Sequence, residues 1–332
     1  MVFRLSRNTN RLDHLQKYNQ TSRQNKRALD FFPPRRILTA NIPVKRLNVY
    51  LILAIQQLIS GATHIVAKAV VTEVDAAVLT FLRTVIASAG LLAITSMRSG
   101  RFKIDRGDWG QFALLGFLGV ALNQFLYLYG LRFTTAANGA LLYASTPAFV
   151  LLLSHVLLKE RITPKKTTGI TIAFVGITIV IFERGIDLSS TYALGNLIIL
   201  IAVVAWTFAM VLGKRMIIKH GALQTTTAMM TIGAILFSPF GILSTISYPV
   251  FHLSPFHWAG ILYLAIGTSI VGYVLWYHAL GRIEASKVAV FANAQPVVAA
   301  ILSLIFLDYS LTIGFVTGSI ITIGGIVVTQ RG

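Results

Sequence analysis

The sequence contains no cysteine, and only 12% of its 332 residues are charged. The absence of cysteine excludes a disulfide framework, a thiolate metal site and a cysteine nucleophile. The charged share is about half of that in an ordinary soluble domain. Because 55% of the residues are hydrophobic and the mean hydropathy is +0.72, there is more apolar surface than a soluble core can bury. The composition therefore predicts a membrane protein, in which lipid covers the apolar surface.

The net charge of +18 would suit a nucleic-acid partner, but the distribution of the charge argues against one. Residues 1–46 hold eleven Lys/Arg and two Asp, and the other cations are scattered over short loops. This segment lacks the apolar stretch of a signal peptide. We interpret residues 1–46 as a basic, disordered cytosolic tail, and we expect no nucleic-acid partner.

Apolar runs separated by short polar loops fill the rest of the chain. Because a helix needs about 20 residues to cross the hydrocarbon layer, the runs predict an all-α polytopic protein with ten transmembrane helices. The predicted spans are 49–70, 75–97, 109–131, 135–158, 166–183, 193–213, 222–246, 258–281, 284–307 and 311–330.

The orientation follows from the distribution of Lys and Arg. With a cytosolic tail, cytosolic segments hold 25 of the 29 Lys/Arg and outer loops hold only Arg132 and Arg184, while Lys68 and Arg83 lie within spans. Cytosolic loops of membrane proteins carry such an excess. Both termini are therefore expected in the cytosol, with the protein in the plasma or inner membrane.

This orientation predicts which positions can be labelled from outside the cell. A reporter fused after Gly332 should be cytosolic, because ten spans return the chain to its starting side. A cysteine placed at Ser189 should react with an impermeant reagent, and one at Lys165 should not. The reverse pattern would contradict both the span count and the orientation.

The second half of the chain repeats the first. "TTAANGALLYASTPAFVLLLSHVLLKERIT", 134–163, returns as "IEASKVAVFANAQPVVAAILSLIFLDYSLT", 283–312, and residues 109–177 have 16 identities in 69 positions at this offset of 149. A block of five helices is odd, so the second copy enters the membrane from the opposite side. The sequence thus predicts two inverted five-helix repeats, 47–187 and 188–332, an arrangement typical of transporters with a site near the bilayer midplane.

The repeat resembles the drug/metabolite transporter superfamily, specifically its EamA-type ten-helix exporters. The resemblance covers about residues 48–330 and rests on "ANGALLYASTPAFVLLLSHVLLKERIT", its weaker partner "ASKVAVFANAQPVVAAILSLIFLDYSLT" and Arg83 in "LTFLRTVIASAGLLA". Where the family often has a glutamate, this chain has Asp308 followed by Tyr309. The resemblance implies a secondary transporter that exports small organic metabolites by alternating access. Amino-acid-like and aromatic compounds are both possible substrates, and the sequence leaves the choice open.

Polar and aromatic side chains inside the spans are the candidates for a substrate cavity. Pro147 and Pro296 occupy equivalent midplane positions and are candidate hinges, since proline frees a backbone carbonyl. Amides buried in a membrane should face protein or a wet cavity, although any one residue could equally hold helices together. The set of cavity candidates is Gln57, His64, Asn123, Tyr127, Tyr143, Trp206, Tyr273, Trp276, Asn293 and Gln295.

Charged groups are almost absent from the spans. No Asp or Glu lies near the midplane, so a carboxylate proton relay is missing, and His64 is the best-placed titratable group. Transport is therefore expected to be mostly facilitative, with any proton coupling running through His64. Arg83 is assigned a structural or gating role, with binding of an anionic substrate as the alternative.

Other classes of function fit the sequence less well. An intramembrane enzyme needs a nucleophile–base set or paired carboxylates, and neither is present, so no catalytic residue, cofactor or metal is expected. A channel favours rings of like residues, whereas the two halves differ in their polar residues; a channel or a non-transporting scaffold stays as the alternative. Gly169, Gly176, Gly318 and Gly325 permit close helix contact, so the fifth and tenth helices could pack within the chain or form a homodimer.

Overall fold

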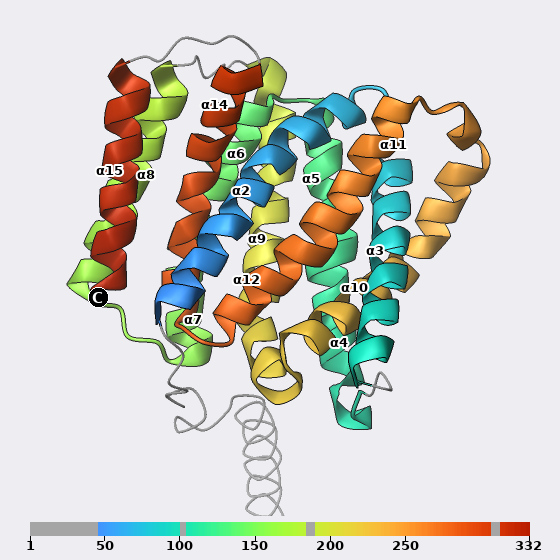
Figure 1. The fold of residues 1–332 in the computed structure, drawn as a ribbon, viewed down its shortest axis with the longest axis horizontal. Helices are drawn as coiled ribbons and strands as arrows, with labels where there is room; N and C mark the ends of the chain where they lie inside the picture. The colour runs from blue at the N-terminus through green and yellow to red at the C-terminus, as the bar shows by residue number, and fades with distance from the viewer. Residues whose placement is uncertain (1–45, 100–103, 184–189, 307–312) are drawn as a thin grey trace, which may run out of the picture.

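The computed structural model describes residues 46–99, 104–183, 190–306 and 313–332. This part of the chain consists of helices joined by short connections and contains no strand (Figure 1). Apart from Arg46, the predicted tail of residues 1–46 lies outside the described residues, as do Asp308 and Tyr309.

The first half contains five helical segments, of which the third and fourth are irregular. The first two segments are α2 (Arg46–Val71) and α3 (Ala76–Ser99). The third consists of η1 (Arg106–Asp108), α4 (Trp109–Gly116), η2 (Phe117–Leu122) and α5 (Asn123–Arg132). The fourth consists of α6 (Ala136–Ala144) and α7 (Thr146–Leu158), and the fifth is α8 (Pro164–Glu183).

The second half follows the same order. It begins with α9 (Ser190–His220) and α10 (Ala222–Ile246), which the short η3 (Val250–His252) follows. The next segment consists of α11 (Pro255–Leu262), η4 (Tyr263–Gly272) and α12 (Tyr273–Leu280). The one after it consists of α13 (Ala285–Ala289), η5 (Val290–Ala294) and α14 (Gln295–Phe306), and the last is α15 (Ile313–Gln330).

Among the described residues, seven helical stretches are long and apolar enough to cross a membrane: Asn48–Val71, Ala76–Arg98, Arg106–Arg132, Asn138–Leu158, Tyr192–His220, Ala222–Ile246 and Pro255–Leu280. α8 and α15 lie within about two residues of the predicted fifth and tenth spans, and α13, η5 and α14 together cover the ninth. The predicted class, an all-α polytopic membrane protein, is confirmed.

The helix that contains the sixth predicted span is longer than the span itself. The sixth span was expected to end at residue 213, before three cationic residues, but α9 continues to His220. The helix continues because these cations are compensated: Lys214 pairs with Glu160, and Lys219 pairs with Asp105 and Asp108.

Short polar side chains fix several helix starts. Oδ1 of Asp75 accepts from the N–H of Ala77 at the start of α3, and Thr135 and Ser254 accept in the same way at α6 and α11. Such caps satisfy backbone donors that a first turn leaves without partners. They define where α3, α6 and α11 begin.

The irregularities of the two halves fall at equivalent positions. η2 is a π-helical stretch, and its equivalent at the offset of 149, residues 266–271, lies inside the π-helical η4. The first residues of α7 and α14, Thr146 and Gln295, are also equivalent, and each precedes a proline that cannot donate to the preceding turn. Figure 1 shows the equivalent helices α8 and α15 side by side and running in opposite directions, as inverted copies do.

α8 and α15 are held in direct backbone contact by small residues. A Cβ on Gly325 would lie 2.6 Å from the carbonyl oxygen of Gly169, and one on Gly176 would lie 2.7 Å from that of Gly318. These distances are too short for any side chain, so glycine is required at the contact. The fifth and tenth helices, expected as packing or dimer surfaces, thus pack on each other within one chain, and a homodimer stays a prediction.

A polar cavity as the candidate functional site

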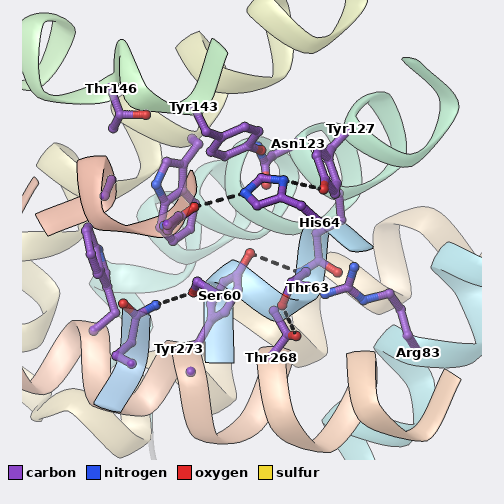
Figure 2. A pocket seen from close by; sticks show the side chains of 17 residues that line it. Ser60, Thr63, His64, Arg83, Asn123, Tyr127, Tyr143, Thr146, Thr268 and Tyr273 are labelled. Carbon is purple, nitrogen blue, oxygen red and sulfur yellow. Dashed lines mark hydrogen bonds between the residues drawn. The ribbon is translucent and has the colours of Figure 1, made fainter. Parts of the chain in front are cut away.

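A cavity of about 100 Å³ lies between the two halves of the chain (Figure 2). Residues from α2, α3, α5, α6, α7, α9, η4, α12, η5 and α14 contribute to its wall. The lining residues are Gln56, Ser60, Thr63, His64, Arg83, Asn123, Gln124, Tyr127, Tyr143, Thr146, Trp206, Thr268, Gly272, Tyr273, Trp276, Ala292 and Gln295.

His64 forms the centre of one hydrogen-bond chain. Its Nε2 lies 3.0 Å from Oε1 of Gln295, and its Nδ1 lies 2.8 Å from the hydroxyl of Tyr127 (Figure 2). Because an amide oxygen only accepts, Nε2 carries the hydrogen and Nδ1 accepts from Tyr127. A neutral imidazole thus satisfies both contacts, and it joins α2 to α5 and to α14.

Residues at equivalent positions of the two halves meet at the cavity. Nε2 of Gln124 donates to the hydroxyl oxygen of Tyr273 over 3.1 Å, and these two residues are separated by the repeat offset of 149. Tyr127 and Trp276 are a second equivalent pair, and both line the cavity. The cavity therefore lies where the two repeats meet, but with different side chains on the two sides.

The wall is rich in aromatic side chains. The rings of Trp206 and Tyr273 are 5.2 Å apart, edge to face, and those of Tyr127 and Tyr143 are 5.3 Å apart in the same arrangement. Nδ2 of Asn123 holds the Tyr143 hydroxyl at 2.7 Å. The wall therefore combines aromatic faces with a few amides, the composition typical of small-molecule pockets.

Arg83 brings a charge into this cavity from α3. Its side chain is buried, with 2% of its surface exposed, and its Nη2 donates to Oγ of Ser269 over 2.9 Å. Figure 2 shows the guanidinium reaching toward Thr63 and His64. No carboxylate lines the cavity within the described residues.

The sequence-predicted site residues are mostly brought together. His64, Asn123, Tyr127, Tyr143, Trp206, Tyr273, Trp276 and Gln295 line the cavity, together with Arg83. Pro147 and Pro296 each follow a lining residue. Gln57 and Asn293 do not line it: Gln57 donates to Gln56, and Asn293 is fully buried in η5.

Several lining residues were not among the predicted set. Gln56, Ser60 and Thr63 share a face of α2 with His64, at spacings of four, three and one residues. A polar stripe at helical spacing in an apolar helix was the signal that could have identified them. Thr268 of η4 lies 2.7 Å from the hydroxyl of Thr63, a contact that only the tertiary structure creates.

A buried ionic cluster joins the connection after α7 to the end of α9 and the start of α13. Glu160 accepts from Nζ of Lys214 at 2.9 Å and from the backbone N–H of Ala285 at 2.8 Å, and it contacts Ser286 through both its N–H and its hydroxyl. Its side chain is 8% exposed and that of Lys214 is 7% exposed. The carboxylate therefore joins the connection after α7, the end of α9 and the first turn of α13.

Electrostatics keeps this carboxylate ionised. Burial alone would raise the pKa of Glu160, but the Lys214 ammonium and the N–H groups of Ala285 and Ser286 outweigh it. The pKa of Glu160 consequently lies below its ordinary value of 4.5. The negative charge also lies at the N-terminus of α13, where the helix favours it.

At the opposite end of the molecule, Lys68 donates to backbone carbonyls as Lys214 does, but its charge is compensated differently. Nζ of Lys68 donates to the carbonyls of Leu131 and Thr134 at 2.8 Å each. Lys214 likewise donates to the carbonyl of Ile283, the equivalent of Thr134 at the repeat offset. No ion pair of Lys68 with a described carboxylate is present, so the two ends differ in charge compensation.

One group of described side chains has the types that bind metals. Asp105, Asp108 and His220 lie together at the end of α9, but Nζ of Lys219 is 2.6 Å from a carboxylate oxygen of each aspartate. The lysine already supplies the positive charge that a cation would bring, so the group is accounted for as an ionic contact.

Comparisons with known proteins agree with this architecture. A model described as the EamA-like transporter family matches residues 47–182 and again 193–331. The chain belongs to this family. The uncharacterized transporter YyaM of Bacillus subtilis is 31% identical over 263 residues, which cover 78% of this chain and 86% of that protein. An uncharacterized transporter of Archaeoglobus fulgidus is 30% identical over 283 residues, covering 85% and 97%.

A solved crystal structure has the same fold as this family member. Its TM-score is 0.71 at 20% sequence identity, and the alignment covers 86% of this chain and 98% of the other. At this identity the likeness extends to the fold alone. The membership in a transporter family thus rests on the sequence matches, and the fold comparison adds the arrangement of helices.

Proposed function

We propose that this EamA-family protein is a secondary transporter that exports small organic metabolites across the cell membrane by alternating access. The observation that carries this proposal is the polar cavity between two repeats whose helices are interrupted at equivalent positions. Two similar halves of opposite orientation can exchange conformations and open one site to either side in turn. No catalytic role is proposed for any residue.

The Glu160 cluster and the two prolines have separate roles in this cycle. The Glu160 cluster closes the end predicted to face the cytosol, so export requires it to separate when substrate enters. Pro147 and Pro296 lie next to the cavity at the breaks of their helices, where changes in backbone angle cost least. They are proposed as the hinges of the exchange.

Blocking the cavity tests the proposal. Cells with and without the protein are compared for metabolites that accumulate in the medium. A Ser60→Trp variant fills the cavity and should reduce that accumulation at least tenfold. A Leu58→Trp variant, whose position is 57% exposed on the outer surface of α2, should leave the accumulation unchanged. Equal export by both variants at equal membrane content would contradict transport through this cavity.

Proton coupling is the second property to test. His64 is already satisfied as a neutral imidazole by Tyr127 and Gln295, with Arg83 across the cavity and Lys68 one turn further along α2. We therefore propose facilitated transport down the substrate gradient.

The assay uses proteoliposomes with equal substrate inside and outside and an imposed pH gradient, with protein-free vesicles as the control. No uphill accumulation is expected. Accumulation that a His64→Gln variant loses would replace facilitation by coupling through His64. Accumulation that persists in the His64→Gln variant would exclude both facilitated transport and coupling through His64.

A further inference from the structure

The hydrogen-bonding capacity of Arg83 is mostly unused. A guanidinium offers five N–H donors and stays charged at any physiological pH. Its Nη2 has Ser269 as its partner, but its buried Nε has none among the described residues. An unpaired charge held inside a membrane protein is costly. A ligand that supplies the missing negative charge would remove this cost.

Three other polar atoms of the cavity wall also lack partners within the described part of the chain. They are Nε1 of Trp276, Oγ1 of Thr146 and Oε1 of Gln124. Trp276 can only donate, Gln124 Oε1 can only accept, and the Thr146 hydroxyl can do either. With Arg83, the cavity therefore presents one positive charge, a surplus of donors and one free amide acceptor.

We propose that the substrate of this cavity is a small organic monocarboxylate that also carries a hydroxyl group, an inference that rests on the proposed transport function. The carboxylate accepts from Arg83, which suits its planar pair of oxygens. The hydroxyl donates to Oε1 of Gln124, and Nε1 of Trp276 supplies a further donor.

Charge balance distinguishes a monocarboxylate from a zwitterion, a phosphate monoester or a neutral amide. A monocarboxylate makes the occupied cavity neutral, because Arg83 is the one cation among its described lining residues. A zwitterion would leave one net positive charge and an ammonium with no carboxylate beside it. A phosphate monoester carries about −1.5 to −2 charges at pH 7, which exceeds what one arginine neutralises. A neutral amide would leave Arg83 uncompensated.

The size of the cavity favours a small molecule. An apolar cavity of about 150 Å³ accommodates benzene, and this cavity has about 100 Å³ in the described conformation. The space admits a molecule of a few heavy atoms. Two sets of probes therefore bracket it, one of three-carbon compounds and one with an added phenyl ring.

Binding to the purified protein tests the inference without any transport step. Trp206 and Trp276 line the cavity, so tryptophan fluorescence reports its occupancy. The probes are lactate, lactamide and alanine, and phenyllactate, phenyllactamide and phenylalanine. In at least one set, the hydroxy acid should bind about tenfold or more tightly than both its amide and its amino-acid analogue, the effect expected when a buried charge loses its partner.

Variants assign the preference to Arg83. An Arg83→Gln variant should lose the preference for acid over amide, and an Arg83→Lys variant, which keeps the cation, should retain part of it. Gel filtration and thermal unfolding show whether each variant is folded; if the Gln variant is not, the probe sets on the unmodified protein and the Lys variant still decide.

Three results would overturn the inference: no preference for the acid in either set, tighter binding of the amino acid, or a preference that persists in a folded Arg83→Gln variant. Its failure differs from failure of the proposed function. Transport without acid preference removes this inference alone, whereas acid binding without any transport into proteoliposomes removes the proposed function alone.

Discussion

Replacing Glu160 by alanine is expected to lower the free energy of unfolding by about 3–5 kcal/mol, the cost of breaking a buried ion pair by removing one partner. The variant leaves the Lys214 ammonium buried at 7% exposure with no carboxylate, and it removes the acceptor for the N–H groups of Ala285 and Ser286. The measurement is thermal or denaturant unfolding of the purified protein in detergent.

An exposed ion pair provides the matched control. Arg132 and Asp75 lie 3.0 Å apart and are each 40% exposed, so Arg132→Gln should cost less than about 1 kcal/mol. A double variant, Glu160→Gln with Lys214→Met, should recover much of the loss because it removes both buried charges. If the alanine variant is no less stable than the Arg132 variant, the buried ion pair of Glu160 with Lys214 does not stabilise the fold as predicted.

The same carboxylate predicts an acid-sensitive contribution. The pKa of Glu160 is lower in the folded protein than in the unfolded chain, so its contribution to stability is fully present above the unfolded value, near 4.5. The contribution is lost as the pH falls through the depressed folded pKa. Between pH 7 and 5 the difference in stability between wild type and Glu160→Gln should therefore be constant, and it should shrink only below that range.

Replacing Gly325 by alanine is expected to separate α8 from α15 and to destabilise the protein by about 1–3 kcal/mol, the usual cost of overpacking. The new Cβ would meet backbone atoms of Gly169 and Ala173, which cannot move aside as a flexible side chain can. The expected result is a lower unfolding temperature and weaker protection of both helices in hydrogen exchange.

Gly324, which precedes Gly325 in the sequence, provides the matched control. A Cβ on Gly324 meets nothing within 4 Å, so Gly324→Ala changes helix propensity by the same amount without a clash. That variant should be neutral or more stable by about 0.5–1 kcal/mol. Equal effects at the two positions would mean that the close contact of α8 with α15 does not require glycine.

The fold class was predictable because its causes are local. Apolar runs of membrane-spanning length give helices wherever the backbone must satisfy its own hydrogen bonds, and the repeat at an offset of 149 makes the second half a copy of the first. The sequence also predicted the breaks at Pro147 and Pro296. It did not predict that α9 continues past residue 213, since that depends on partners for Lys214 and Lys219 from other parts of the chain.

The site was predictable in part. Polar residues within apolar helices had to face protein or a cavity, and eight of the ten candidates do line one cavity. Adjacent helix positions point about 100° apart, and because both residues are glutamines, only the spacing to Ser60 and Thr63 distinguishes Gln56 from Gln57. Asn293 and Gln295 are two residues apart in the ninth helical segment, and only the path of η5 decides that Gln295 reaches the cavity.

By itself, the sequence determined the helices, their repeat and the scarcity of charge within the membrane, because each of these follows from neighbouring residues or from a fixed offset. The tertiary structure decided which charges find partners. Glu160 meets Lys214 and the start of α13 across separations of 54 and 125 residues, whereas Arg83 meets a serine and no described carboxylate. Both are buried charged side chains, and only the path of the chain in space gives Glu160 an ion pair with Lys214 and gives Arg83 a single serine partner.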